Sequence, residues 1–78
     1  MVNTNKLKGL IASEGLTHYE FAEKIGLSAG GFHKKLHNIN DFKSSEIEKI
    51  SEFFNITDAV EKNKIFFARN EELKSSNQ

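Results

Sequence analysis

The sequence lacks cysteine, lacks an excess of charge of either sign and contains a single arginine, Arg69. Without cysteine, no disulfide can stabilise the fold and no cysteine-based zinc site can form. Eleven basic and eleven acidic residues give a formal net charge of zero, which argues against a protein that merely adheres to polyanions. The charge is nevertheless uneven, because lysines outnumber acids in residues 1–43 and acids outnumber basic residues in residues 44–78.

Long apolar runs are also missing. No stretch approaches the roughly 20 apolar residues of a membrane-spanning helix, and the first residues, MVNTNKLKGL, do not have the pattern of a signal peptide. We therefore expect a soluble, cytoplasmic protein that binds no membrane. The length of 78 residues suits one small domain. A domain of this size buries only about 60% of its unfolded surface, so each large apolar residue matters for stability.

Apolar residues at helical spacing predict a series of short helices. In the first helix, Leu7, Leu10 and Ile11 share one face, and Gly15 ends the helix because glycine accepts the left-handed conformation. Its N-terminal cap is expected among three polar residues: Asn3, Thr4 and Asn5.

The stretch LTHYEFAEKIG predicts a second helix of about two turns. Thr17 and Glu20 have the spacing of a capping box, in which each side chain accepts a hydrogen bond from a free backbone N–H, and Gly26 ends the helix. The residues expected to face inward are Phe21, Ala22 and Ile25.

The stretch SAGGFHKKLH predicts a third helix. Ser28 is a favourable N-terminal cap, Phe32 and Leu36 lie on the buried side, and Asn38 takes the left-handed exit position.

A fourth helix is expected after the loop NINDF. A second capping box is predicted from Ser45 and Glu48, and Asn55 is expected to end the helix. Its apolar face is formed by Ile47, Ile50 and Phe54. Four acidic residues are expected at solvent-facing positions: Glu46, Glu48, Glu52 and Glu61.

The remainder of the chain is harder to interpret. AVEKNKIFFA fits a short helix followed by an extended stretch. We expect an all-α fold, a compact bundle of four to five short helices, with a domain over residues 1–68 and a polar, disordered tail over residues 69–78.

Two short helices joined by Gly26-Leu27-Ser28 have the spacing of a helix-turn-helix. The run GLTHYEFAEKIGLSAGGFHKKLHNINDFKSSEIEKISEFFNI resembles the Cro/repressor (XRE-like) helix-turn-helix domain of small phage regulators, over about residues 4–57. The closest resemblance is to a group of short phage regulators that includes the modulators of repression. It is carried by three fragments: GGFHKKL, the DF after the loop and the late IFFA. The resemblance implies a lambda-repressor-like fold and a cytoplasmic location in a bacterial host cell.

The resemblance also implies a function. A transcriptional regulator of this family binds double-stranded operator DNA by placing the helix that starts at Ser28 in the major groove. The alternative is an anti-repressor, which uses the same helix to bind the DNA-binding domain of the phage repressor. The residues expected to contact DNA or this protein partner are His18, Ser28, Ala29, Gly30, Gly31, His33, Lys34, Lys35, Asn38, Asn40, Lys43 and Ser44.

Two of these residues weaken direct base recognition. Gly30 and Gly31 offer no side-chain donor or acceptor to a base edge, and each interior helical glycine costs up to about 1 kcal/mol relative to alanine. Glycine does permit close approach of the backbone to a partner. Lys34, Lys35 and Lys43 remain able to bind phosphate, and His33 to reach a base. The lysine pair is equally consistent with an ordinary solvated face.

Other functions have weaker support. His33 and His37 have the i, i+4 spacing that can bind a metal, but no third ligand is evident, so surface histidines near a helix C-terminus are the preferred interpretation. No nucleophile–base constellation is visible, so we expect no enzyme, no cofactor and no small-molecule substrate.

The seven phenylalanines are many for so small a core. Three of them are candidates for a dimer or partner surface: Phe53, Phe66 and Phe67. An exposed apolar patch often marks an interface, and regulators of this type often form homodimers. Of the two IFFA aromatics, Phe66 and Phe67, one is expected to complete the core while the other is left for a partner. The alternative, that both rings complete the core, remains open.

Overall fold

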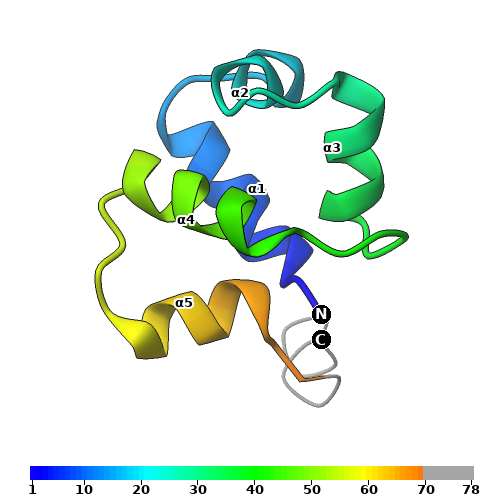
Figure 1. The fold of residues 1–78 in the computed structure, drawn as a ribbon. Coiled ribbons are helices and arrows are strands. Elements are labelled where there is room, and N and C mark those ends of the chain that lie inside the picture. Colours follow the sequence, from blue (N-terminus) through cyan, green and yellow to red (C-terminus); the bar gives the residue numbers. More distant parts are fainter. Residues whose placement is uncertain (70–78) are drawn as a thin grey trace.

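The computed structural model describes residues 1–69 and confirms the all-α class. Within these residues the chain forms five helices and no strand: α1 (Thr4–Ser13), α2 (His18–Lys24), α3 (Ala29–Leu36), α4 (Ser44–Phe53) and α5 (Ala59–Phe66) (Figure 1). Of the tail predicted to be disordered, residues 69–78, all but Arg69 lie outside the described residues. No helix in the described part is long and apolar enough to cross a membrane.

The starts of the first three helices follow the predicted side-chain caps. Asn3 accepts a hydrogen bond from the backbone N–H of Lys6 at 3.1 Å. The capping box of α2 is complete, because Thr17 Oγ1 accepts from Glu20 N–H at 3.1 Å and Glu20 Oε1 accepts from Thr17 N–H at 2.9 Å. Local sequence therefore determines where these helices begin.

Helix ends also follow the sequence. Gly26 has φ +78°, a left-handed conformation that directs the chain from α2 into the short turn before α3. Asn38 adopts a φ of 63° after α3, as predicted, and Asn55, expected to end α4, also adopts a positive φ of 57°.

The start of α4 differs from the prediction. The helix begins at Ser44 and its N-cap is Lys43, so the expected capping box of Ser45 and Glu48 is wrong. Glu46 takes the N3 position instead, and its Oε1 accepts a hydrogen bond from Lys43 N–H at 2.8 Å. Glu46 is consequently buried rather than solvent-facing, whereas Glu48 is exposed.

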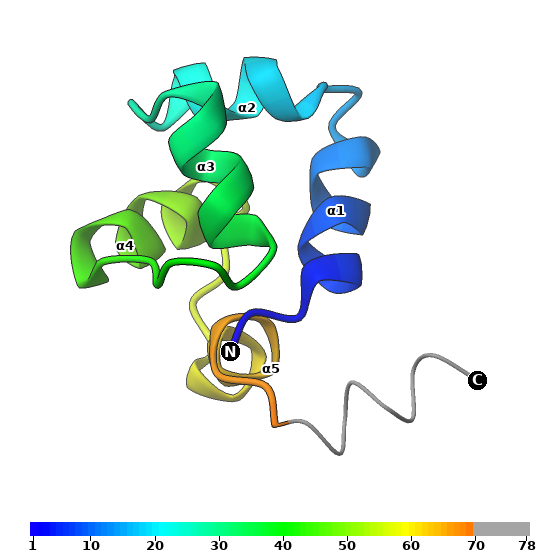
Figure 2. The same cartoon turned by 90° about the vertical axis from the view of Figure 1, so that its right-hand side faces the viewer.

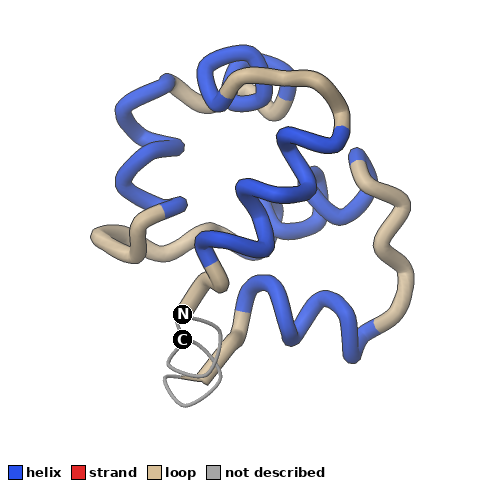
Figure 3. The backbone as a smooth tube through the Cα atoms, turned by 180° about the vertical axis from the view of Figure 1, so that it is seen from behind, coloured by secondary structure: helices blue, strands red, loops and turns tan. Residues whose placement is uncertain are grey.

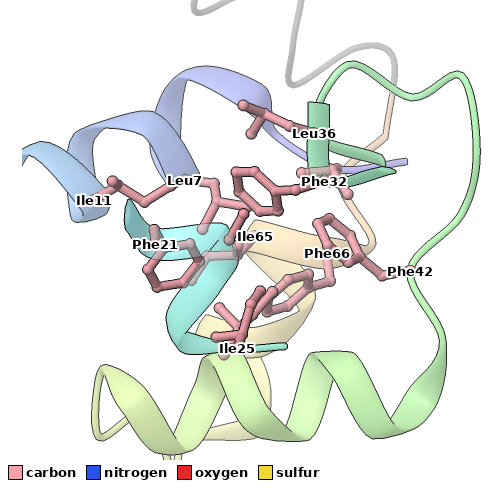
Figure 4. Close-up of a cluster of buried hydrophobic side chains, with 12 residues drawn as sticks. Leu7, Ile11, Phe21, Ile25, Phe32, Leu36, Phe42, Ile65 and Phe66 are labelled. Atoms are coloured by element: carbon pink, nitrogen blue, oxygen red, sulfur yellow. The ribbon is translucent and has the colours of Figure 1, made fainter. Parts of the chain in front are cut away.

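Phenylalanine rings form a continuous chain of contacts through the core (Figure 4). Ring centroids lie 5.5 Å apart for Phe21 and Phe32, 6.0 Å for Phe32 and Phe42, and 5.9 Å for Phe42 and Phe66. The aliphatic residues labelled around these rings in Figure 4 are Leu7, Ile11, Ile25, Leu36 and Ile65. Because the rings come from α2, α3, the following loop and α5, this chain connects elements distant in sequence.

The N-terminal residues are fixed between two elements. Asn3 N–H donates to the Ile65 carbonyl at 2.7 Å, and Ala68 N–H donates to the Met1 carbonyl at 2.8 Å. On the other side, the Asn38 side chain forms two hydrogen bonds with the backbone of Val2, at 2.7 and 2.9 Å. The N-terminal segment therefore holds the C-terminal end of α3 and the end of α5 in place.

The views in Figures 2 and 3 show how the helices are arranged. α2 crosses the top of the molecule, and α1 and α3 descend from its two sides. Seen from behind, α5 lies below α1, and the loop over residues 37–43 extends outward between α3 and α4. One long side of α3 is thus covered by the core, and the other lies on the outside of the molecule.

Candidate functional site

Helix α3 is positioned by its packing on α2. Leu27, in the turn between them, donates its N–H to the Ala22 carbonyl at 2.9 Å, and Ile25 is buried. Phe32 is 1% exposed and lies edge-on to Phe21 of α2. Phe32 and Leu36, four residues apart, are the buried residues of α3 and lie on the same side of the helix. The opposite side of α3 is therefore free of core contacts.

The exposed side of α3 carries four residues at positions i, i+3, i+4 and i+7. These residues, with Ala29 beside them, will be called the α3 face: Ala29, Gly30, His33, Lys34 and His37. All five are exposed, and side chains at this spacing lie on one side of a helix. The predicted binding residues of α3 are therefore only partly brought together.

The two adjacent glycines have different structural roles. A Cβ added at Gly31 would lie 2.9 Å from Ser28 Oγ, the atom that accepts the Gly31 N–H at 3.1 Å and caps the helix. A Cβ added at Gly30 would meet nothing within 4 Å. A side chain at Gly31 would therefore require the capping hydroxyl to shift, whereas a Cβ at Gly30 would enter open space.

The two adjacent lysines differ as well. Lys35 Nζ lies 2.7 Å from both carboxylate oxygens of Glu46, and both side chains are nearly buried. Burial raises the pKa of the Glu46 carboxyl, but hydrogen bonds from Lys35 and from Lys43 N–H outweigh burial and lower the pKa below its usual range. Lys35 is therefore a structural cation and does not contribute to the α3 face.

Lys34, in contrast, is exposed and forms no ion pair within the described residues. It remains available as a cation. At the C-terminal end of α3, burial lowers the pKa of His37, and His33, Lys8 of α1 and His18 of α2 lower it further when they are positively charged. His37 therefore lies near titratable or cationic side chains from α1, α2 and α3.

The three histidines are not gathered into one cluster of potential metal ligands within the described residues. The ring centroids of His33 and His37 are 4.4 Å apart, and His18 instead lies edge-on to Phe32 at 6.4 Å. No group of three or more potential ligands that could hold a metal ion occurs within residues 1–69.

The loop after α3 supplies some of the predicted contact residues. Asn40, Lys43 and Ser44 are exposed next to the start of α4. Asn38 is not available in the same way, because both ends of its side-chain amide are bonded to Val2. Asn38 therefore anchors the C-terminal end of α3.

The structure separates the two IFFA aromatics, as expected, and leaves Phe66 out of the candidate partner surface. Phe66 is 3% exposed and belongs to the core, because α5 directs it toward Phe42. Phe53 is only 37% exposed and packs edge-on against Phe21 and Phe54. Phe67, at 58% exposure, is the one phenylalanine of the chain that lies outside the ring contacts. Only Phe67 is thus a largely exposed aromatic on α5.

Two exposed apolar residues near the α3 face were not predicted. Tyr19 and Ile39 are each 65% exposed, and Tyr19 lines a shallow hollow of about 120 Å³ together with Leu27 and Ala29. A sequence signal exists for Tyr19, since it falls outside the inward-facing positions of α2. Ile39 could have been noticed because it follows the left-handed Asn38, where the helical pattern has ended.

Comparison with known proteins gives no further guide: no family model, no curated protein and no solved structure matches the chain.

Proposed function

We propose that this protein is a helix-turn-helix transcriptional regulator that binds operator DNA through the α3 face. The observation that supports the proposal most is the exposed stripe Gly30, His33, Lys34 and His37 on a short helix whose opposite side is fixed in the core. A rigid helix of this kind fits the major groove of B-DNA. The resemblance of the sequence to phage regulators points in the same direction.

Charge supports duplex DNA as the partner. Lys34 is an unpaired cation within the described residues, and His33 and His37 on the same face become cationic on protonation. Lys43 and Ser44 lie at the exposed start of α4, where free backbone N–H groups favour an anion. In this proposal these groups contact phosphates, and the first turn of α3 approaches the bases.

Fluorescence anisotropy with duplexes from the intergenic regions of the source genome tests the proposal. Binding is expected to weaken steeply with salt, because each phosphate contact adds about 0.9 to the slope of log K against log salt concentration. Lys34→Gln is expected to weaken binding and to reduce this slope by about 1.

Lys64→Gln is the matched control, because Lys64 is an exposed lysine of α5 that lines a different hollow, together with Val60 and Asn63. Equal effects of the two substitutions would show that net charge, rather than the α3 face, determines binding. Failure to bind any duplex would refute DNA binding.

A second candidate function uses the same face against a protein. Tyr19 and Ile39 are exposed apolar side chains near α3, and the hollow beside Tyr19 is lined by Leu27 and Ala29. Such side chains favour a protein interface, and the chain has no net charge. We infer from these features the alternative of an anti-repressor that binds the DNA-binding domain of the phage repressor.

The two functions are separated by one further measurement. Addition of a candidate phage repressor with its operator to the anisotropy experiment would leave an independent DNA regulator bound to its own duplex. An anti-repressor would instead release the repressor from its operator. In that case Tyr19→Ala would weaken the release, although Lys34 is unchanged in this variant.

A further inference from the structure

The first turn of α3 presents almost no hydrogen-bonding groups on its exposed side. Ala29 offers a methyl group, Gly30 offers only backbone, and Ser28 Oγ is held by the Gly31 N–H at 3.1 Å. The second turn is different, since His33 and Lys34 both carry polar nitrogen atoms. The α3 face is therefore divided into an apolar first turn and a cationic second turn.

The fold does not require the bare surface at Gly30. Its φ lies outside the left-handed region, and the space around an added Cβ is open. Alanine at this position would favour the helix, because glycine is among the least favourable residues in a helix interior. Gly9 in α1 has the same open surroundings, so open space alone does not identify a binding position. What distinguishes Gly30 is its place in the exposed stripe, one turn before the unpaired Lys34.

The chemistry of the major groove limits what an apolar turn can recognise. Every base pair presents donors or acceptors there, but the only apolar group is the C5-methyl of thymine. A methyl group approaching Ala29 and the Gly30 backbone needs no hydrogen-bond partner, and the cations of the second turn complement the adjacent phosphates. A glycine at this point leaves room for the methyl group.

We propose that the first turn of α3 recognises a thymine methyl group through contact with Ala29 and the bare backbone of Gly30. This inference rests on the DNA binding proposed above. Burial of one methyl-sized group corresponds to about a fourfold gain in affinity. An added Cβ at Gly30 occupies the same space, so Gly30→Ala is expected to weaken binding about tenfold and to remove most of the preference for thymine.

The test starts from a duplex selected from a randomised library with the intact protein. Each thymine of the selected duplex is replaced in turn by deoxyuridine, which removes only the methyl group, and affinities are measured by anisotropy. At one or more positions the wild-type protein is expected to lose about fourfold in affinity. For the Gly30→Ala variant, replacing thymine by deoxyuridine at those positions is expected to reduce the affinity only slightly.

Stability measurements exclude misfolding as the cause. Gly30→Ala is expected to raise the unfolding temperature by about 4 °C while binding weakens. Gly9→Ala is the matched control: it should raise the unfolding temperature similarly and leave both affinity and the thymine preference unchanged.

The possible failures are distinguishable. If the selected duplex binds but tolerates deoxyuridine at every position, thymine recognition is overturned and DNA binding stands. Wild-type affinity and thymine preference in Gly30→Ala would overturn it as well. If the library yields no bound duplex, DNA binding and thymine recognition both fail, and the protein partner remains.

Discussion

The two sides of α3 differ in how completely their residues are constrained. On the inner side, Phe32 and Leu36 are buried, and Lys35 is bonded to Glu46. On the outer side, Gly30 has open space around it, and Lys34 has no ion pair within residues 1–69. The comparison teaches that neighbouring residues of identical type, such as the two glycines and the two lysines, can have opposite roles. The inner residues fix the helix, and the outer residues remain available.

The largest expected effect is on the inner side, at Phe32. Phe32→Ala removes a ring that contacts Phe21 and Phe42, and substitutions of this kind cost about 3–5 kcal/mol. A domain of this size has about 5 kcal/mol of stability, so we expect this variant to be largely unfolded by circular dichroism. His33→Ala, one position along on the outer side, should change the free energy of unfolding by no more than about 0.5 kcal/mol. Equal effects would contradict the distinction between the two sides.

The next effect concerns the ion pair beneath α3. Glu46→Gln leaves the ammonium group of Lys35 nearly buried without its counter-charge, and we expect a loss of about 3 kcal/mol in urea unfolding. The matched control is Glu48→Gln, which breaks the Glu48–Lys62 pair, whose carboxylate side is exposed. That change should cost no more than about 1 kcal/mol.

The same pair predicts an acid dependence of stability. The pKa of Glu46 is lower in the folded protein than the ordinary value of about 4.3, so its contribution is complete above that value. The contribution is lost as the pH falls below about 4.3 and through the folded-state pKa. Urea unfolding of the wild-type protein should therefore lose more stability between neutral and acidic pH than unfolding of the double variant Lys35→Met, Glu46→Leu. Parallel pH profiles would contradict this role of the pair.

A smaller effect is expected at the end of α3. Asn38→Gly keeps the left-handed backbone and removes the two hydrogen bonds to Val2, which should cost about 1–3 kcal/mol. Asn38→Ala should cost about 1 kcal/mol more, because alanine must also adopt positive φ. Asn55→Gly is the control: Asn55 has a similar φ, and no side-chain hydrogen bond joins it to the described residues. A loss of stability in this control as large as in Asn38→Gly would show that backbone flexibility, rather than the contact with Val2, is responsible.

The smallest expected effect is on the pKa of His37, on the outer side of α3. Burial and the neighbouring cations lower the pKa of His37, so its titration followed by NMR should have a midpoint below the usual value of about 6.5. Lys8→Met removes one of these cations and should raise the midpoint. An unchanged midpoint would mean that α1 and α3 do not share the charged environment described above.

Much of the fold could be predicted from local sequence, and the reasons are physical. The caps at Asn3, Thr17 and Ser28 and the left-handed residues Gly26 and Asn38 act through neighbours within a few positions, so the sequence alone is sufficient to identify them. Apolar spacing likewise predicted the buried sides of α2 and α3.

The errors came from contacts between residues distant in sequence. The burial of Glu46 depends on Lys35, eleven residues earlier, and the role of Asn38 depends on Val2 at the start of the chain. Likewise, only the packing of α5 distinguishes the buried Phe66 from the exposed Phe67. In the candidate site, the exposed stripe followed from helical spacing, whereas the loss of Lys35 from it required the three-dimensional structure.

The hydrogen bonds between the first residues and the end of α5 also affect how the chain folds during synthesis. The N–H of Asn3 bonds to the carbonyl of Ile65, and the carbonyl of Met1 accepts from the N–H of Ala68, so these contacts join the two ends of the described residues. A ribosome releases the N-terminus first, and long-range contacts of this kind slow folding. We expect the helices α1 to α3 to emerge without their final support, and the domain to close only after Ile65 and Ala68 have left the exit tunnel.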